Sequence, residues 1–195
     1  MDTDAFNGRL LQGERIVWSG RPAGGLLLTG WDIVAIPFSI FWCGFMVFWE
    51  GAAIFGATDA EKAGPTAAPV LLFPLFGLPF ICVGLFMVIG RFWLDAWIRA
   101  RVRYALTDQR ALIARSGPFR SFTSLYLERL PDVQIKERGD GRGTIVFGQR
   151  ASLFFGRGYS LWLPSLDATP QFLVIENPRQ VFDLIQHKAR SRTAD

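Results

Sequence analysis

The chain has 195 residues, of which 50% are hydrophobic and 19% are charged, and its formal net charge is +4. That length leaves room for two membrane crossings and one small folded domain, and it excludes a large enzyme core. Both cysteines, Cys43 and Cys82, fall inside apolar runs, so we expect neither a disulfide framework nor an aqueous metal site. The first residues lack a short apolar stretch behind a basic start, and we expect no removable secretory signal.

Two apolar runs, residues 33–49 and 70–89, contain no charged side chain. Each is about as long as a helix must be to cross roughly 30 Å of hydrocarbon, where an unpaired charge is costly. We therefore predict a cytoplasmic segment over residues 1–29, followed by a transmembrane helical hairpin with a juxtamembrane helix over residues 30–100. Residues 50–69 form the expected outer connection.

Tryptophans mark the ends of the expected spans. Trp31 and Trp49 flank the first span, and Trp93 and Trp97 follow the second, where amphipathic indoles settle at headgroup depth. Asp32 is the one acid near the first span. We interpret Asp32 as a helix N-cap in the membrane interface and not as part of a proton path.

The charge distribution predicts the orientation of the hairpin. Residues 91–195 hold 17 Lys and Arg against 10 Asp and Glu, a net charge of +7, whereas residues 50–69 carry a net charge of −2. By the positive-inside rule both termini should lie in the cytoplasm. Four arginines after the second span either hold the following domain against anionic headgroups or serve only as a topology signal. They are Arg91, Arg99, Arg101 and Arg103.

From residue 101 the hydrophobic period changes from helical to alternating. Seven short apolar runs separated by Gly, Pro and Asp predict a small β-barrel or sandwich over residues 101–195. The expected strands are VRYAL, RALIAR, SFTSLYL, VQIKE, TIVFG, YSLWL and QFLVIE. The glycine-rich ERGDGRG at residues 137–143 lies between two strands, so it predicts a hairpin connection and not a phosphate-binding loop.

The chain ends in a predicted helix. Asn177 can cap it, and Pro178 suits its first turn. One apolar stripe of this helix should cover an open end of the strands. The stripe consists of Val181, Phe182, Ile185 and Ala189. The single histidine, His187, has no second ligand beside it, and we expect no metal and no cofactor.

Three stretches resemble bacterial membrane-anchored pleckstrin-homology (PH) domain proteins. GERIVWSGRP at residues 13–22 is similar to the segment before their membrane hairpin, YALTDQRALI at 104–113 resembles their first β-hairpin, and ENPRQVFDLI at 176–185 resembles the start of their last helix. The resemblance implies an α+β chain, with a two-helix transmembrane hairpin followed by a PH-like seven-stranded barrel or sandwich capped by a C-terminal α-helix. It also implies the bacterial inner membrane, and it carries no catalytic residues.

The expected function is that of a non-enzymatic scaffold or adaptor, anchored in the lipid bilayer, whose domain binds a protein partner. No nucleophile, base and orienting group occur together in the sequence. Phe154, Phe155 and Trp162 are candidates for the partner surface, although strand alternation would bury some of them in the core.

Two alternatives stay open. The domain could bind anionic lipid, but the loop between its first two expected strands offers only Arg110 beside Asp108. Further arginines are scattered in a way that is typical of a solvated face. They are Arg115, Arg120, Arg138, Arg142, Arg150 and Arg157. The chain could instead be an accessory subunit of a membrane enzyme or transport complex, although its carboxylates fall at turns and strand ends. Nucleic acid is not an expected partner.

Overall fold

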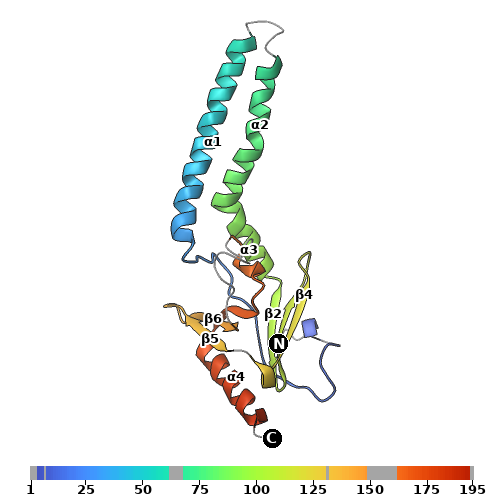
Figure 1. Ribbon diagram of the computed structural model, residues 1–195. Coiled ribbons are helices and arrows are strands. Elements are labelled where there is room, and N and C mark those ends of the chain that lie inside the picture. The colour runs from blue at the N-terminus through green and yellow to red at the C-terminus, as the bar shows by residue number, and fades with distance from the viewer. Residues whose placement is uncertain (1–3, 7, 62–67, 131, 149–161, 194–195) are drawn as a thin grey trace. The chain divides into compact units, whose positions relative to one another are not determined.

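The structure, a computed structural model, describes residues 4–6, 8–61, 68–130, 132–148 and 162–193 (Figure 1). The chain divides into two compact units. The β unit combines Met1–Gly25 with Asp95–Asp195, and the helical unit is Leu26–Leu94. The N-terminal segment therefore belongs to the same unit as the C-terminal half of the chain.

The helical unit contains α1 (Asp32–Glu61) and α2 (Ala68–Leu85), which pack against each other. A π-helical turn, η3 (Phe86–Gly90), joins α2 to α3 (Arg91–Arg99). Two helical stretches, Asp32–Gly56 and Leu75–Arg99, are long and apolar enough to cross a membrane. Only 17% of each apolar window is buried, whereas the core helix of a water-soluble protein would be mostly buried.

The first helix is longer than the sequence analysis predicted, because α1 continues through residues assigned to the outer connection. Glu50 consequently lies within a helix, and only 6% of it is exposed. A Cβ atom at Gly77 would collide with the Glu50 carboxylate, and a Cβ atom at Gly84 would lie 3.1 Å from the Cα atom of Cys43. These two glycines of α2 therefore allow the close approach of α1.

Seven strands are present in the described residues, arranged in two antiparallel sheets. The first sheet has the order β1-β2-β3-β4 and the second has the order β5-β6-β7, and the two do not close into one barrel. The strands are β1 (Ile16–Gly20), β2 (Val102–Thr107), β3 (Arg110–Arg115), β4 (Ser121–Tyr126), β5 (Val133–Glu137), β6 (Arg142–Phe147) and β7 (Gln171–Glu176). Six of the seven expected runs are confirmed as strands.

The remaining expected run, YSLWL, lies mostly outside the described residues. Its first three residues lie outside the described part of the chain, and Trp162 and Leu163 are in no strand. The seventh described strand is β1, which comes from the segment before the helical unit and pairs with β2 from Ile16 to Gly20. The sequence analysis missed β1 because its partner strand, β2, lies far from it in the sequence.

Aromatic side chains from both sheets form the centre of the β unit. The ring of Phe172 lies 5.5 Å from that of Trp18, 4.8 Å from that of Tyr104 and 5.0 Å from that of Phe147, measured between centroids. The Leu173 backbone N–H donates a hydrogen bond of 3.0 Å to the Tyr104 hydroxyl. Strands β1, β2, β6 and β7 therefore share one core.

A buried ion pair holds the segment before β1 against the β2–β3 turn. The Glu14 carboxylate accepts a hydrogen bond of 2.5 Å from Arg110 Nη2 and one of 2.7 Å from the Thr107 hydroxyl. Burial alone would raise the pKa of Glu14, but the hydrogen bonds from Arg110, the Leu11 N–H and Thr107 outweigh it and lower the pKa to about 2. Glu14 is therefore ionised at neutral pH.

The predicted hairpins and the last helix are confirmed. In the β5–β6 connection, the Arg138 N–H donates to the Arg142 carbonyl at 2.8 Å, and Gly141 has a φ of +77°, which favours glycine. Helix α4 (Pro178–Thr193) contacts β5, β6 and the short helix η4 (Leu127–Arg129). Val181 and Ile185 of its apolar stripe are buried.

Candidate functional site

The four tryptophans at the expected membrane boundaries are at least partly exposed. Trp31 precedes α1, Trp49 lies inside it, and Trp93 and Trp97 lie in α3. Their exposed fractions run from 36% for Trp97 to 78% for Trp93. Exposed indoles at these positions suit the interfacial role predicted for them.

Asp32 and Arg91 form a buried ion pair inside the helical unit. The Asp32 Oδ1 atom lies 2.6 Å from Arg91 Nη2, and both side chains are at most 5% exposed. Asp32 Oδ2 also accepts hydrogen bonds from the Thr29 N–H at 2.5 Å and from the Thr29 hydroxyl at 2.8 Å. Asp32 therefore lies in the first turn of α1 and its carboxylate reaches back to Thr29, as the acid of a capping box does, so Asp32 is not the N-cap residue that the sequence analysis predicted.

Arg99 is equally enclosed, within the β unit. Its Nε donates to Asp95 at 2.8 Å, and its terminal nitrogens donate to the carbonyls of Ala23 and Gly25 at 2.8 and 2.5 Å. The other Asp95 oxygen accepts hydrogen bonds from the N–H and the hydroxyl of Ser165 at 3.0 and 2.7 Å. Arg91 and Arg99 are therefore both neutralised by carboxylates inside the protein.

The other two arginines of the predicted membrane-surface set are half-buried. The Arg101 guanidinium lies 3.6 Å from the centroid of the Trp97 ring and donates to the Trp97 carbonyl at 2.9 Å. Arg103 donates to the carbonyls of Ala100 and Val102 at 2.9 and 3.0 Å. Contact of these arginines with headgroups stays a prediction.

The predicted partner surface lies largely outside the described residues. Phe154 and Phe155 fall in the segment 149–161, of which the structure describes nothing. Trp162 is half-buried and directly precedes the buried Leu163. The assignment of these three residues to a protein-binding surface stays a prediction.

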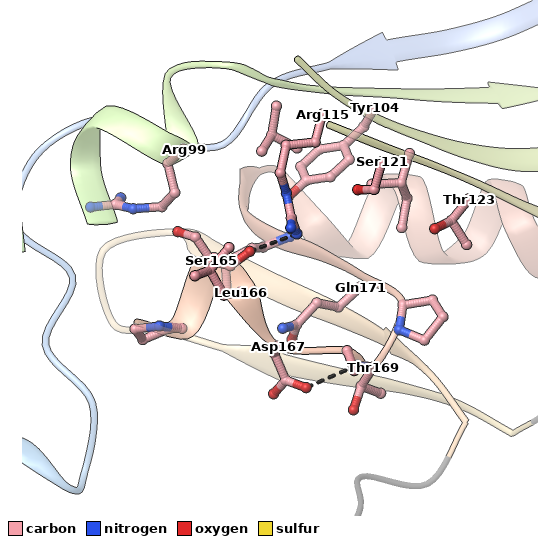
Figure 2. A pocket seen from close by; sticks show the side chains of 16 residues that line it. Arg99, Tyr104, Arg115, Ser121, Thr123, Ser165, Leu166, Asp167, Thr169 and Gln171 are labelled. Atoms are coloured by element: carbon pink, nitrogen blue, oxygen red, sulfur yellow. Dashed lines mark hydrogen bonds between the residues drawn. The ribbon is translucent and has the colours of Figure 1, made fainter. Parts of the chain in front are cut away.

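A cavity of about 220 Å³ opens in the β unit (Figure 2). Side chains from both sheets line it, together with the short helix η6 (Pro164–Leu166) and the segment that leads from it to β7. Its polar lining includes Arg115, Ser121, Thr123, Asp167, Thr169 and Gln171. The lining also includes Arg99, so the cavity combines two arginines and the Asp167 carboxylate with several groups that can donate hydrogen bonds.

Arg115 differs from the other enclosed arginines because no described carboxylate pairs with it. Its Nη2 donates to the Ser165 carbonyl at 2.7 Å, and its buried Nε has no hydrogen-bond partner. Burial lowers the pKa of the Arg115 guanidinium, although it remains a cation at neutral pH. By contrast, three buried arginines in the described residues each have a carboxylate partner. They are Arg91 with Asp32, Arg99 with Asp95 and Arg110 with Glu14.

The sheet register places the donors of the cavity on one face. Arg115 is paired across the sheet with Ser121, and Ile113 with Thr123. Directly paired residues share a face, as do residues two apart along a strand, so Arg115, Ser121 and Thr123 all face the cavity. Sequence analysis treated Arg115 as part of a scattered set. The short SGPFR connection could have indicated this role in the sequence, because it makes β3 and β4 a hairpin. The hairpin brings Arg115 opposite Ser121.

Three carboxylates of the β unit each have a hydrogen-bonding or ionic partner. Asp108 accepts a hydrogen bond from the Arg15 N–H, Asp140 accepts one from the Arg142 N–H, and Glu137 pairs with Arg179. Within the ranges that the structure describes, no three His, Cys, Asp or Glu side chains lie close enough together to hold a metal ion.

Comparison of the chain with models of protein families, with curated proteins and with solved structures finds no match. The resemblance to PH-domain proteins therefore stays a prediction, and the functional argument depends on the residues themselves.

Proposed function

We propose that the protein is a non-enzymatic scaffold or adaptor of the bacterial inner membrane, with a transmembrane hairpin as anchor and the β unit as a module that binds a protein partner in the cytoplasm. One observation carries the proposal: β1 precedes the two apolar helices in sequence, β2 follows them, and the two strands pair from Ile16 to Gly20. A PH-like fold is part of the proposal. It is supported by a four-stranded sheet, a three-stranded sheet and a C-terminal helix, which occur in that order.

The β1–β2 pairing constrains how the chain can enter a membrane. Strands of one sheet must lie on the same side of the bilayer, because an irregular backbone does not pass through hydrocarbon. The helical unit must therefore cross an even number of times. Two apolar helices with mostly exposed side chains supply two crossings.

The distribution of Lys and Arg supports a cytoplasmic β unit. Arg9, Arg15 and Arg21 precede the helical unit, and the arginine-rich segment after α2 follows it, whereas the connection between α1 and α2 contains a single Lys62. Basic residues near span ends are retained in the cytoplasm.

Reporter fusions test the anchor. We expect alkaline phosphatase to be inactive when fused after Asp195 and active when inserted between residues 62 and 67, and we expect the protein to stay in membranes washed with carbonate. Release by carbonate, or an active C-terminal fusion, would contradict the proposal.

Co-purification tests the binding role. The full chain, extracted from its native membranes in mild detergent, should retain a reproducible protein partner that is lost when both Phe154 and Phe155 are replaced by Ser. Phe119→Ser is the matched control, because Phe119 is an aromatic residue of the β unit that is exposed. If the double variant retains the partner, or if Phe119→Ser loses it equally, the assignment of Phe154 and Phe155 to the partner surface is wrong.

The alternative of headgroup recognition at the β2–β3 turn gains no support. Its one cation, Arg110, is only 6% exposed and is paired with Glu14, and the neighbouring Asp108 is acidic. A site for an anion is favoured at a different place, the Arg115 cavity.

A further inference from the structure

The cavity beside Arg115 contains a charge that the described protein does not balance. The guanidinium is half-buried, makes one hydrogen bond to a neutral carbonyl, and keeps a buried Nε without a partner. Removing a charge partly from water without a counter-charge destabilises a fold, so the retention of this half-buried arginine needs an explanation. An anion bound in the cavity would supply both the missing charge and the missing hydrogen-bond acceptor.

Neutral donors surround this cation. The Ser121 and Thr123 hydroxyls lie on the same sheet face as Arg115, as the β3–β4 register requires. The Tyr104 hydroxyl also lines the cavity, and it accepts a hydrogen bond from Leu173, which leaves its own hydrogen available. Burial raises the pKa of Tyr104 well above its usual range, so this hydroxyl keeps its proton.

The charges that line the cavity limit the charge of the ligand. Arg99 is already balanced by Asp95, and the Asp167 carboxylate lies apart from Arg115 in Figure 2, where it accepts a hydrogen bond of 2.9 Å from the Thr169 N–H. Arg115 offers a ligand one cation without a counter-charge, and the Asp167 carboxylate in the same cavity repels further negative charge. These two groups suit a ligand group with a single negative charge. A volume of about 220 Å³ lies below the roughly 300–1,000 Å³ of sites for drug-sized ligands, so the ligand is small.

We propose that the Arg115 cavity is a binding site for a singly charged phosphate group, held by the Arg115 guanidinium and by the hydroxyls of Ser121 and Thr123. The oxygens of a phosphate are arranged tetrahedrally, so each of the three donors can contact a separate oxygen, whereas a planar carboxylate offers only two oxygens. The phosphate could belong to a soluble phosphate ester or to the headgroup of an anionic phospholipid. This site goes beyond the proposed adaptor function and does not depend on a protein partner.

The test uses the full chain in lipid nanodiscs. In one arm the nanodiscs contain phosphatidylcholine only, and inorganic phosphate or glycerol 3-phosphate is titrated at pH 5, where each carries mostly a single negative charge, while ³¹P spectra and the melting temperature are recorded. In the other arm the nanodiscs contain phosphatidylglycerol, and native mass spectrometry counts the phosphatidylglycerol molecules that the released protein retains. The first arm detects a soluble ligand and the second a lipid headgroup.

Arg115→Gln should weaken phosphate binding at least tenfold in whichever arm is positive, and Ser121→Ala combined with Thr123→Val should weaken it without changing the charge. Arg120→Gln is the matched control, because Arg120 is an exposed arginine of the same β3–β4 hairpin and should leave binding unchanged. Without ligand, Arg115→Gln should melt no earlier than the wild type, since it removes a half-buried charge that has no counter-charge.

Several results would overturn the proposal. They are the absence of saturable binding in both arms, an equal loss with Arg120→Gln, and binding of an acidic peptide at Arg115 without competition by phosphate. A melting temperature that falls sharply for Arg115→Gln without ligand would also count against it, because it would assign the residue a structural role. These readouts do not depend on a protein partner. If the adaptor experiment finds no co-purifying protein, the phosphate-binding proposal is still tested by its own measurements.

Discussion

At the scale of single residues, the Glu14–Arg110 pair attaches the N-terminal segment to the β unit. Because hydrogen bonds lower the pKa of Glu14 from 4.5 to about 2, the ionised carboxylate stabilises the fold. A shift of this size corresponds to about 3 kcal/mol. The contribution is fully present above pH 4.5, the ordinary value for the unfolded chain, and is lost as the pH falls towards 2.

We therefore predict that Glu14→Gln lowers the melting temperature of the detergent-solubilised protein at pH 7, and that its difference from the wild type shrinks between pH 4.5 and pH 2. Differential scanning fluorimetry over this range measures the effect. Glu137→Gln is the control, because the Glu137–Arg179 pair is more exposed and such surface pairs contribute little. A gap between wild type and Glu14→Gln that is independent of pH would refute the linkage.

The residues of the candidate site were only partly predictable. The exposed tryptophans follow from hydropathy and position alone, since indoles at span ends need no tertiary information. The role of Arg115 depends on which arginines find a carboxylate. Asp95 lies one helical turn before Arg99, but the other two partners come from distant segments: Asp32 pairs with Arg91, and Glu14 lies 96 residues from Arg110. A single sequence shows the arginines but not the pairing that leaves Arg115 without a counter-charge.

At the scale of elements, the contact between α1 and α2 depends on glycines. A Cβ atom at Gly84 would lie 3.2 Å from the Cβ atom of Cys43, close to the separation of about 3.5–4.5 Å found in disulfides. The contact was not predictable in detail, because hydropathy marks apolar runs and says little about which faces meet. For the same reason Glu50, which helix packing encloses beside Gly77, was assigned to a loop.

We predict that Gly84→Cys, made together with Cys82→Ser, forms a disulfide with Cys43 when native membranes are treated with a mild oxidant. Mass spectrometry of the linked peptides measures it. Val83→Cys in the same background is the control, because Val83 is 50% exposed and should cross-link much more slowly. Equal rates for the two variants would show that α1 and α2 do not meet through Gly84.

At the scale of the whole molecule, the β unit is assembled from both sides of the helical unit. Short apolar runs separated by turn residues predicted six of its strands without knowledge of their partners. It could not predict β1, whose place is set by pairing with β2 and by the contact of Trp18 with Phe172. The chain from residue 101 onward is therefore an incomplete sheet.

We predict that residues 95–195 expressed alone aggregate, because the edge of β2 is left unpaired. Joining residues 1–25 to residue 95 through a flexible Gly/Ser linker should restore a soluble fold with a dispersed NMR spectrum. The control carries residues 1–25 in scrambled order. A well-dispersed spectrum from residues 95–195 alone would show that β1 is dispensable.

The interrupted sheet also has a consequence for how the protein is made on the ribosome. After Gly20 emerges, roughly 80 further residues must be synthesised before Val102 appears, which takes about 4 to 16 seconds at 5 to 20 residues per second. During that delay β1 has no partner strand, while the two apolar helices are synthesised. If the helical unit crosses the membrane as proposed, a nascent chain with only one crossing would leave β1 and β2 in different compartments, where they could not pair.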